Sequence, residues 1–244
     1  MQVTIRHHFD FGADRELVGE DLVTPESWDA LRTQTSGPFA AAASREELAQ
    51  VAEGRPELGE RAREIDHWLE ANSIGTLASY GVGGGTLEWW LQRLQPDRRL
   101  LLADYAPATV ERLGELFPDA EVHRHNLLAD PPLQADAHLF HRVDTELTNA
   151  EWHEAMRRFA AERVLMVATE VATPRRLLYE LLLRLRRRHL SRAGWLRTRG
   201  AFEALWRETH DARPLRLQDL DGWALTPRQV QPGNVPARTG KPVA

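Results

Sequence analysis

The sequence predicts an α/β fold: a doubly wound, mostly parallel seven-stranded sheet with a C-terminal antiparallel hairpin and an N-terminal helical extension. Three observations lead to it. Short apolar runs alternate with helical patterns from residue 74 to residue 169, which is the order of parallel strands joined by crossover helices. A glycine-rich turn at residues 81–85 joins the first apolar run to the first of these helices. Two further apolar runs flank Asp221-Gly222, which is typical of a hairpin.

The elements of the predicted sheet can be assigned in order along the chain. Residues 163–169 are the most apolar strand, as expected for the buried middle of a parallel sheet. Pro107 and Asn149 stand at the starts of two crossover helices. The predicted strands are 74–79, 99–103, 120–125, 137–141, 163–169, 214–220 and 222–227, and the predicted helices of this region are 86–95, 107–117, 149–159 and 200–210.

Two regions flank this predicted domain, which occupies residues 72–228. Residues 1–71 are expected to form a helical extension, either plain packing or a lid. A capping-box pattern at Ser44-Arg45-Glu46-Glu47 opens one helix there, and apolar residues at helical spacing predict another over residues 56–71. Residues 229–244 are rich in proline, glycine and polar residues, and we expect them to form a flexible tail.

Composition and length limit the classes of protein to consider. A chain of 244 residues suits one α/β domain with an appendage. It has no cysteine, which excludes disulfides, thiolate zinc sites and cysteine nucleophiles. Because no run of about 18 apolar residues occurs and the first residues lack an apolar signal core, we expect no transmembrane span and a cytoplasmic location. The sequence leaves the oligomeric state open.

Neither charge nor motif favours a nucleic-acid partner. The net charge of −5 argues against general nucleic-acid binding by the whole chain. Asp130-Pro131-Pro132-Leu133 has the outline of a base-methylation motif, but it follows the third strand of the sheet, whereas that motif follows the fourth. Its last residue is also not aromatic, so it cannot stack a flipped base. We therefore expect a loop at this segment and no nucleic acid among the partners.

A glycine turn followed by an acid indicates a nucleotide-type ligand. Gly81, Gly83 and Gly85 let the backbone approach a ligand closely, and the helix that follows offers its N-terminal amides. Asp104 ends the next strand, where a carboxylate can accept both hydroxyls of a ribose. The sequence therefore predicts an adenosine-type cofactor. Thr86 stands where the dinucleotide fingerprint has a further glycine or alanine, which disfavours NAD.

The segment from Leu77 to Glu88 resembles motif I of the class I S-adenosylmethionine (SAM) dependent methyltransferases, and the likeness extends over residues 72–228. A terminal hairpin that adds an antiparallel strand is similar to the end of that family's sheet. The resemblance implies an enzyme that uses SAM as cofactor and methylates a small molecule, most simply at oxygen. A sugar, a glycolipid or a specialised metabolite would fit as the acceptor.

The resemblance also implies which residues bind the cofactor. The glycine turn would pass beneath the methionine part of SAM, Asp104 would hold the ribose, and Tyr105 would pack against the adenine. Asn126 stands where the family binds the adenine amino group, and the backbone of Leu127 would meet the ring edge. The whole implied set is Ser79, Tyr80, Gly81, Gly83, Gly85, Asp104, Tyr105, Asn126 and Leu127.

The sequence departs from this family at two places. Ser79 and Tyr80 stand where the family has an acidic residue, and a serine can bond the methionine ammonium without contributing charge. Residues 160–163 replace a Gly-Gly turn. These departures keep open a non-catalytic binding protein that retains the fold. The other alternative is a NAD(P)-dependent oxidoreductase, which shares Asp104 but conflicts with Thr86 and the hairpin.

His141 and Asp144 are the candidate catalytic residues. His141 ends the fourth strand, at the edge where ligands bind, and imidazole titrates near neutrality, so it is a candidate general base. Asp144, with Glu146 close by in the sequence, is a candidate to orient His141 or to bind the acceptor, and the alternative is an acid cluster at the start of a helix. The alternative for His141 is packing or a backbone contact beside the cofactor. His141, Asp144 and Glu146 are also metal-ligand types, but their spacing matches no metal motif, so we predict no metal.

Residues 173–200 are predicted to be a helical insertion that shapes the acceptor region. Leucines at 178, 181, 182 and 185 share one helix face, and most of the charged residues at the other positions are arginines. A basic amphipathic helix at this place fits an anionic or lipid-linked acceptor, or a membrane surface. The alternative is a solvated helix with no ligand.

Overall fold

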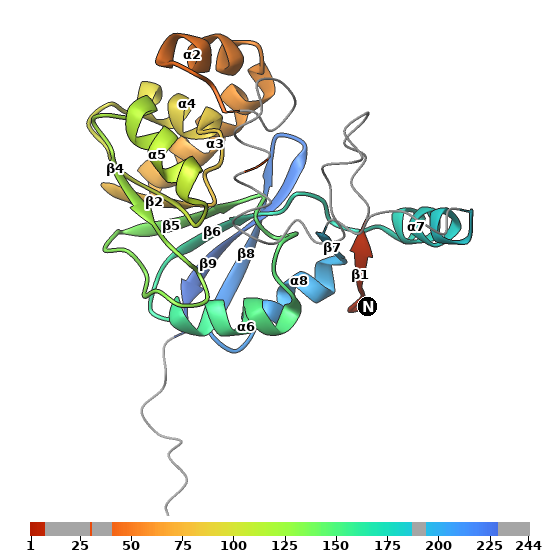
Figure 1. Ribbon diagram of the computed structural model, residues 1–244. Coiled ribbons are helices and arrows are strands. Elements are labelled where there is room, and N and C mark those ends of the chain that lie inside the picture. Colours follow the sequence, from red (N-terminus) through yellow and green to blue (C-terminus); the bar gives the residue numbers. More distant parts are fainter. Residues whose placement is uncertain (8–29, 31–40, 187–193, 229–244) are drawn as a thin grey trace, which may run out of the picture.

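The computed structural model describes residues 1–7, 30, 41–186 and 194–228. Its main sheet has seven strands, drawn at the centre of Figure 1. The strands that lead from one edge through the middle are parallel, and the last two are antiparallel. In sheet order they are β4 (Glu121–Arg124), β3 (Arg99–Asp104), β2 (Thr76–Tyr80), β5 (Ala137–His141), β6 (Val164–Val167), β9 (Leu220–Pro227) and β8 (His210–Leu217). This confirms the predicted sheet and its terminal hairpin.

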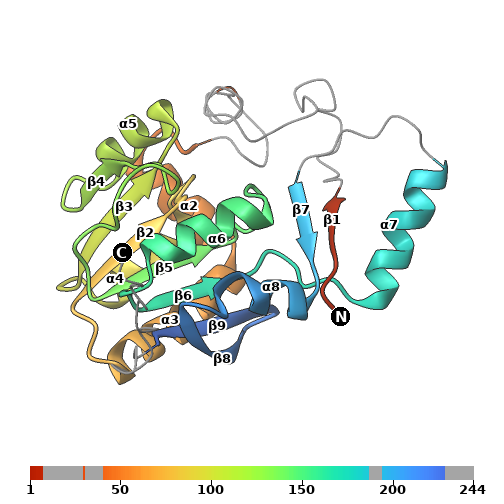
Figure 2. The ribbon, with the colours of Figure 1, turned by 90° about the horizontal axis from the view of Figure 1, so that it is seen from below.

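Helices cover both faces of this sheet. α3 (Pro56–Ala71), α4 (Thr86–Leu94) and α5 (Pro107–Leu116) contribute to one hydrophobic core. α2 (Arg45–Glu53) packs against α3 and α4, and its Leu48 joins the same core. On the other face, α6 (Asn149–Arg158) and α8 (Arg199–Trp206) build a second core, and Figure 2 shows them lying together across the sheet.

The two cores follow from the alternation of side chains along each strand. In β2, Leu77 lies in the core of α3 and α4, and Ala78 lies in the core of α6 and α8. In β5, Leu139 and Phe140 divide in the same way. The rule places Ser79 and His141 on the α3 side of the sheet, and it places Tyr80 on the α6 side. The strand pattern therefore decides which layer each candidate residue can reach.

The helix starts have recognisable causes. Pro56 and Pro107 occupy the first turn of α3 and α5, where a missing backbone N–H costs nothing. α6 begins with a full capping box, in which Thr148 and Glu151 each bond the other's backbone N–H. The Ser44 side chain accepts from the Glu47 backbone N–H at the start of α2, as the sequence pattern predicts.

Two predictions about the C-terminal part were wrong. The hairpin turns at Gln218 and Asp219, between β8 and β9, and Asp221-Gly222 lies inside β9. Gln218 takes the left-handed conformation that the turn needs, with φ of +54°. Gly222 instead lets β9 approach β6, because a side chain there would lie 3.0 Å from the Met166 carbonyl oxygen. The predicted helix at 200–210 ends at Trp206.

A small second sheet was not predicted. β1 (Thr4–His7) pairs antiparallel with β7 (Gly194–Arg197), beside the main sheet (Figure 2). The regions predicted as an N-terminal helical extension and as a helical insertion therefore each contribute a strand. Within the insertion, α7 (Pro174–Arg186) is helical, and its leucines at positions 178, 181, 182 and 185 are exposed. The tail at residues 229–244 lies outside the described residues.

Nothing in the described part of the chain is a candidate membrane span: each helix there is too short or too polar to cross a bilayer.

Candidate functional site

The glycine turn between β2 and α4 requires glycine. Gly81, Gly83 and Gly85 have φ of +65°, +60° and +73°, in the left-handed region that other residues avoid. A side chain at Gly81 would lie 2.3 Å from Val143 Cγ1, and one at Gly85 would lie 2.6 Å from Phe117 Cε2. Sterics thus fix glycine at both ends of the turn. The turn is also tied to β3, because the Gly81 N–H donates to the Ala103 carbonyl at 2.8 Å.

Asp104 lies beside this turn, at the end of β3. It is only 7% exposed, and its Oδ2 accepts a hydrogen bond from the Gly83 N–H at 3.0 Å. Its Oδ1 accepts from the Ala106 N–H, also at 3.0 Å. These two bonds fix the carboxylate beside the glycine turn, at the carboxyl end of β3. The structure therefore brings together the turn and the acid that the sequence singled out.

Ser79 does not stand alone at the end of β2. Its hydroxyl donates to Glu88 Oε1 at 2.7 Å, and both residues are buried. Burial raises the pKa of Glu88 to about 7; the Ser79 hydrogen bond opposes that rise and the negative charge of Asp104 adds to it. An acid is therefore present beside Ser79, supplied by α4. Sequence reasoning missed it, although Glu88 shares the buried face of α4 with Leu87 and Leu91.

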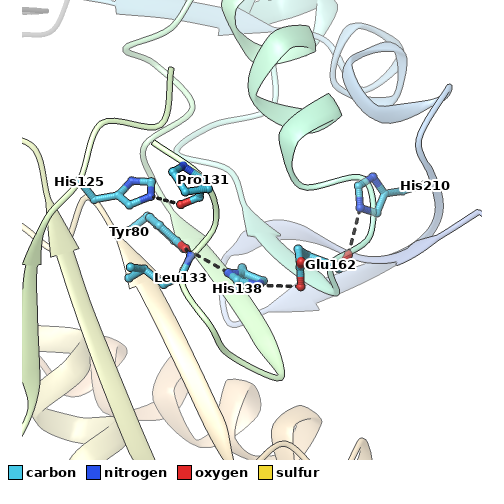
Figure 3. Close-up of polar contacts among 7 residues, drawn as sticks. All are labelled: Tyr80, His125, Pro131, Leu133, His138, Glu162 and His210. Carbon is cyan, nitrogen blue, oxygen red and sulfur yellow. Dashed lines mark hydrogen bonds and ion pairs between the residues drawn. The ribbon is translucent and has the colours of Figure 1, made fainter. Parts of the chain in front are cut away.

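The side chain of Tyr80 lies in the core on the α6 side of the sheet, and Figure 3 shows it next to Leu133 and His138. Its hydroxyl accepts from the Leu133 N–H at 3.0 Å and lies 3.1 Å from His138 Nδ1. His138 Nε2 in turn lies 3.2 Å from Glu162 Oε2. Burial raises the pKa of Tyr80 and lowers that of His138, so both are neutral near pH 7, with Tyr80 donating to His138. The Tyr80 side chain is thus committed to the core, and its backbone is what lies beside the glycine turn.

The same close-up shows how the loop after β4 is held. His125 Nε2 lies 2.9 Å from the Pro131 carbonyl oxygen, a contact within this loop (Figure 3). Elsewhere in the same view, His210 Nε2 lies 3.1 Å from the carbonyl oxygen of Glu162, which follows α6. Residues 131–133 have no regular secondary structure, which confirms the predicted loop.

The candidate adenine-binding residues follow the ends of β3 and β4. These strands are adjacent and parallel, so their carboxyl ends meet at one edge of the sheet. Asn126 is exposed, and its Oδ1 accepts from the Leu128 N–H at 2.9 Å, which shapes the turn after β4. Tyr105 directly follows Asp104 and is half-buried, and Leu127 packs against the core on the α6 side.

His141 is held by an arginine from α3. Arg61 Nη1 lies 3.2 Å from His141 Nε2, and Arg61 Nη2 donates to Asp219 Oδ1 at 2.9 Å. Burial lowers the pKa of His141 well below its usual value, and the charges of Arg61 and Arg142 lower it further. The imidazole is therefore neutral, and its Nε2 lone pair accepts from Arg61. This geometry favours the contact role for His141 over that of a general base.

Asp144 is occupied elsewhere. It is buried, and its Oδ1 accepts from the Thr169 N–H at 2.7 Å and from the Thr169 hydroxyl at 2.8 Å. Burial raises the pKa of Asp144, and the Thr169 bonds oppose that rise. No hydrogen bond joins it to His141 among the described residues, so the two catalytic candidates do not form a pair. In that same part of the chain no group of three His, Asp or Glu side chains is arranged to hold a metal, which covers the set His141, Asp144 and Glu146.

Sequence comparison gives no relative: no model of a known protein family matches the chain, and no curated protein does. Comparison of the structure gives many. The chain superposes on human N-acetylserotonin methyltransferase in complex with SAM, with a TM-score of 0.56 and 16% identity, over 76% of this chain and 57% of that one.

Two further solved structures give the same result. The mitomycin 7-O-methyltransferase MmcR has a TM-score of 0.56 and 16% identity, over 89% of this chain and 76% of that one. PigF with SAH has a TM-score of 0.58 and 14% identity, over 82% of this chain and 62% of that one. The chain thus spans less than two thirds of the human enzyme and of PigF. At these identities the likeness concerns the fold, and the chain has the fold of the class I SAM-dependent methyltransferases.

Proposed function

We propose that this chain binds SAM and transfers its methyl group to an oxygen atom of a small molecule. The observation that carries the proposal is Asp104, a buried carboxylate at the end of β3 that is bonded to the glycine turn at Gly83, where the ribose of a nucleotide-type ligand would lie. The fold supports the proposal, because solved structures that share it include complexes with SAM and SAH.

The residues around the turn fit the parts of this cofactor. Three left-handed glycines bring backbone close to whatever lies over the turn. Ser79 and Glu88 add a hydroxyl and a carboxyl group at the end of β2, and a ligand ammonium group beside that carboxyl would favour its ionised form. Glu88 therefore supplies the ionisable acid that Ser79 alone would lack.

The chemistry asked of the protein is modest. SAM supplies a methyl group already activated on a sulfonium, so the chain's own residues have to position the acceptor and exclude water. His141 and Arg61 lie at the end of β5, one strand away from the glycine turn. We assign them to acceptor positioning.

Calorimetric titration of the protein with SAM, SAH and NADH tests the proposal. Asp104→Ala removes charge-assisted bonds to the ribose and should weaken SAM binding by about 1.5–3 kcal/mol, on the order of 10–150-fold. Asp97→Ala, at an exposed acid before β3, is the control and should bind as the parent does. Thermal melts of each variant exclude unfolding as the cause.

Each alternative has its own outcome in this titration. Binding of NADH in place of SAM and SAH would favour the alternative of a NAD(P)-dependent oxidoreductase. SAM binding without methyl transfer across a broad acceptor panel would favour a non-catalytic protein that keeps the fold. Equal SAM affinity in the Asp104→Ala variant and the parent would show that SAM does not bind at the site proposed around Asp104.

A further inference from the structure

Two arginines, Arg61 and Arg142, lie near His141 at the carboxyl end of β5, and the charge of a third, Arg55, acts on Arg142. We call Arg55, Arg61 and Arg142 the arginine cluster. Arg61 contacts the imidazole directly. Arg142 follows β5 in the chain; burial lowers its pKa, and the positive charge of Arg61 and, more weakly, that of Arg55 lower it further. Neighbouring like charges repel one another, so an anion that joined these arginines would stabilise the arrangement.

Arg61 carries the clearest sign of an incomplete set of partners. The residue is 3% exposed, yet its Nε has no hydrogen-bond partner among the described residues. A buried guanidinium usually has its donors satisfied, because burying an unpaired one is expensive. Its one ion-pair partner in the described chain is Asp219, whose side chain is 68% exposed and sits on the turn between β8 and β9.

The acids near the cluster do not balance it. Asp144 spends one carboxylate oxygen on the backbone and hydroxyl of Thr169. Asp219 is exposed, so water screens much of its attraction for Arg61. Asp144 and Asp219 each raise the pKa of Arg142. Their effects are smaller than the lowering of that pKa by burial and by the charge of Arg61. Positive charge is therefore in excess at this strand end.

Arg142 adds a second, independent sign. Its φ is +61°, a left-handed conformation that is strained for any residue with a Cβ, and part of the residue is exposed at the strand end. Strained residues of this kind concentrate at functional sites. The carboxyl ends of parallel strands are also where ligands of such sheets bind.

We propose that the arginine cluster binds an oxyanion group, a carboxylate or a phosphate, on the acceptor substrate, and that this group replaces Asp219 as the partner of Arg61. That the ligand is the methyl acceptor rests on the proposed function; the anion site itself does not. Guanidinium groups match both anions, because their paired N–H donors fit two oxygens at once.

A purely structural role for the Arg61–Asp219 pair is the competing explanation. The same turn is also fastened to α3 by the Gln218 N–H, which donates to Glu64. If the pair only fastens the turn, removing the Asp219 charge should lower stability without changing ligand affinity. If Asp219 holds the place of a ligand anion, removing its charge should strengthen anion binding.

The test measures binding by NMR titration and calorimetry with SAM left out, so it stands whether or not methyl transfer is found. Benzoate and phenyl phosphate are the charged probes, and benzamide is the neutral match to benzoate. We expect the charged probes to bind and benzamide to bind at least tenfold more weakly. The stronger of the two charged probes identifies carboxylate or phosphate as the group.

Two exposed positions supply the variants, so folding is not at risk from a buried change. Arg142→Gln should weaken the charged probes at least tenfold, and Asp219→Asn should tighten them severalfold. Arg63→Gln, an exposed arginine of α3 that pairs with Glu60, is the matched control and should change nothing. Equal binding of benzoate and benzamide, or unchanged affinity in both the Arg142 and Asp219 variants, would overturn the proposal.

Discussion

Ser79 and Glu88 form one unit, in which strand β2 supplies the hydroxyl and helix α4 supplies the acid. Both side chains are buried, and the carboxyl has a second acid, Asp104, close enough to raise its pKa. Burying a carboxylate in this way favours its protonated form. The pair therefore holds a proton that an exposed glutamate would have lost at neutral pH.

This proton makes stability depend on pH in a defined direction. The pKa of Glu88 is about 7 in the folded protein against a usual 4.5, so unfolding releases a proton between these values. Stability contributed by Glu88 is full below the usual value, falls as pH rises through this window, and is constant above it. Glu88→Gln has no carboxyl proton to lose, so its free energy of unfolding should not fall in this window. Measured against the parent, the variant should therefore be more stable above about pH 7 than at acidic pH, by up to about 3 kcal/mol.

Urea unfolding of parent and Glu88→Gln at about pH 5 and about pH 8 measures this difference. Glu115→Gln, at an exposed glutamate of α5, is the control and should follow the parent. A stability difference between the parent and Glu88→Gln that stays the same at both pH values would show that Glu88 does not titrate in this window.

At the scale of single residues, sequence reasoning found some partners and missed others. Asp104 and the glycines were found because local spacing marks them. Glu88 and Arg61 were missed because their contacts, with Ser79 and His141, join residues from different elements. Side-chain partners of that kind depend on packing, which spacing along the chain does not show.

The start of α4 depends on one backbone conformation. Gly85 is its N-cap residue, with φ of +73°, and no side-chain hydrogen bond caps the helix there. The turn is close-packed as well, since Phe117 lies where a side chain of residue 85 would go. Conformation and space both restrict the position to glycine.

Gly85→Ala should therefore destabilise the protein by about 2–3 kcal/mol, from left-handed strain plus the clash with Phe117. Gly114→Ala is the matched control in α5, where a new methyl group meets nothing within 4 Å. It should stabilise by about 0.5–1 kcal/mol, because glycine is a poor helix former. Denaturant midpoints of the two variants should move in opposite directions, and a common direction would contradict this account.

Elements with a clear apolar period were predictable, and their ends were less so. Strand β5 has the predicted bounds, because apolar residues mark it and polar residues surround it. The hairpin turn was misplaced because Asp221-Gly222 has the composition of a turn, whereas Gln218 takes the left-handed conformation. Tertiary packing of β9 against β6 decided the register there, which local turn preference could not show.

Across the whole molecule, the main sheet and the β1–β7 pair differ in how far their strands are buried and paired. β5 and β6 are buried between two cores. Among the residues that the structure describes, β1 and β7 pair with each other over four residues, and one further parallel bridge joins Val171 to Arg197. A pairing between the start of the chain and residues 194–197 leaves no mark in local sequence, which is why it was not predicted.

Hydrogen exchange should separate these two parts. Backbone amides open with free energies that range from near zero to the global value, and buried central strands lie at the high end. We expect β5 and β6 to exchange slowest and β1 and β7 to exchange much faster. Exchange followed by mass spectrometry of peptic fragments checks this, and protection of β1 equal to that of β5 would show that the two sheets unfold as one.

The place of β9 has a consequence for how the chain is made. β9 is the last described strand to be synthesised, yet it lies between β6 and β8. Until it emerges from the ribosome, one edge of the wholly apolar strand β6 has no partner. An open apolar edge is a template for pairing with other chains. A nascent chain stalled after β8 would therefore be the form most in need of a chaperone.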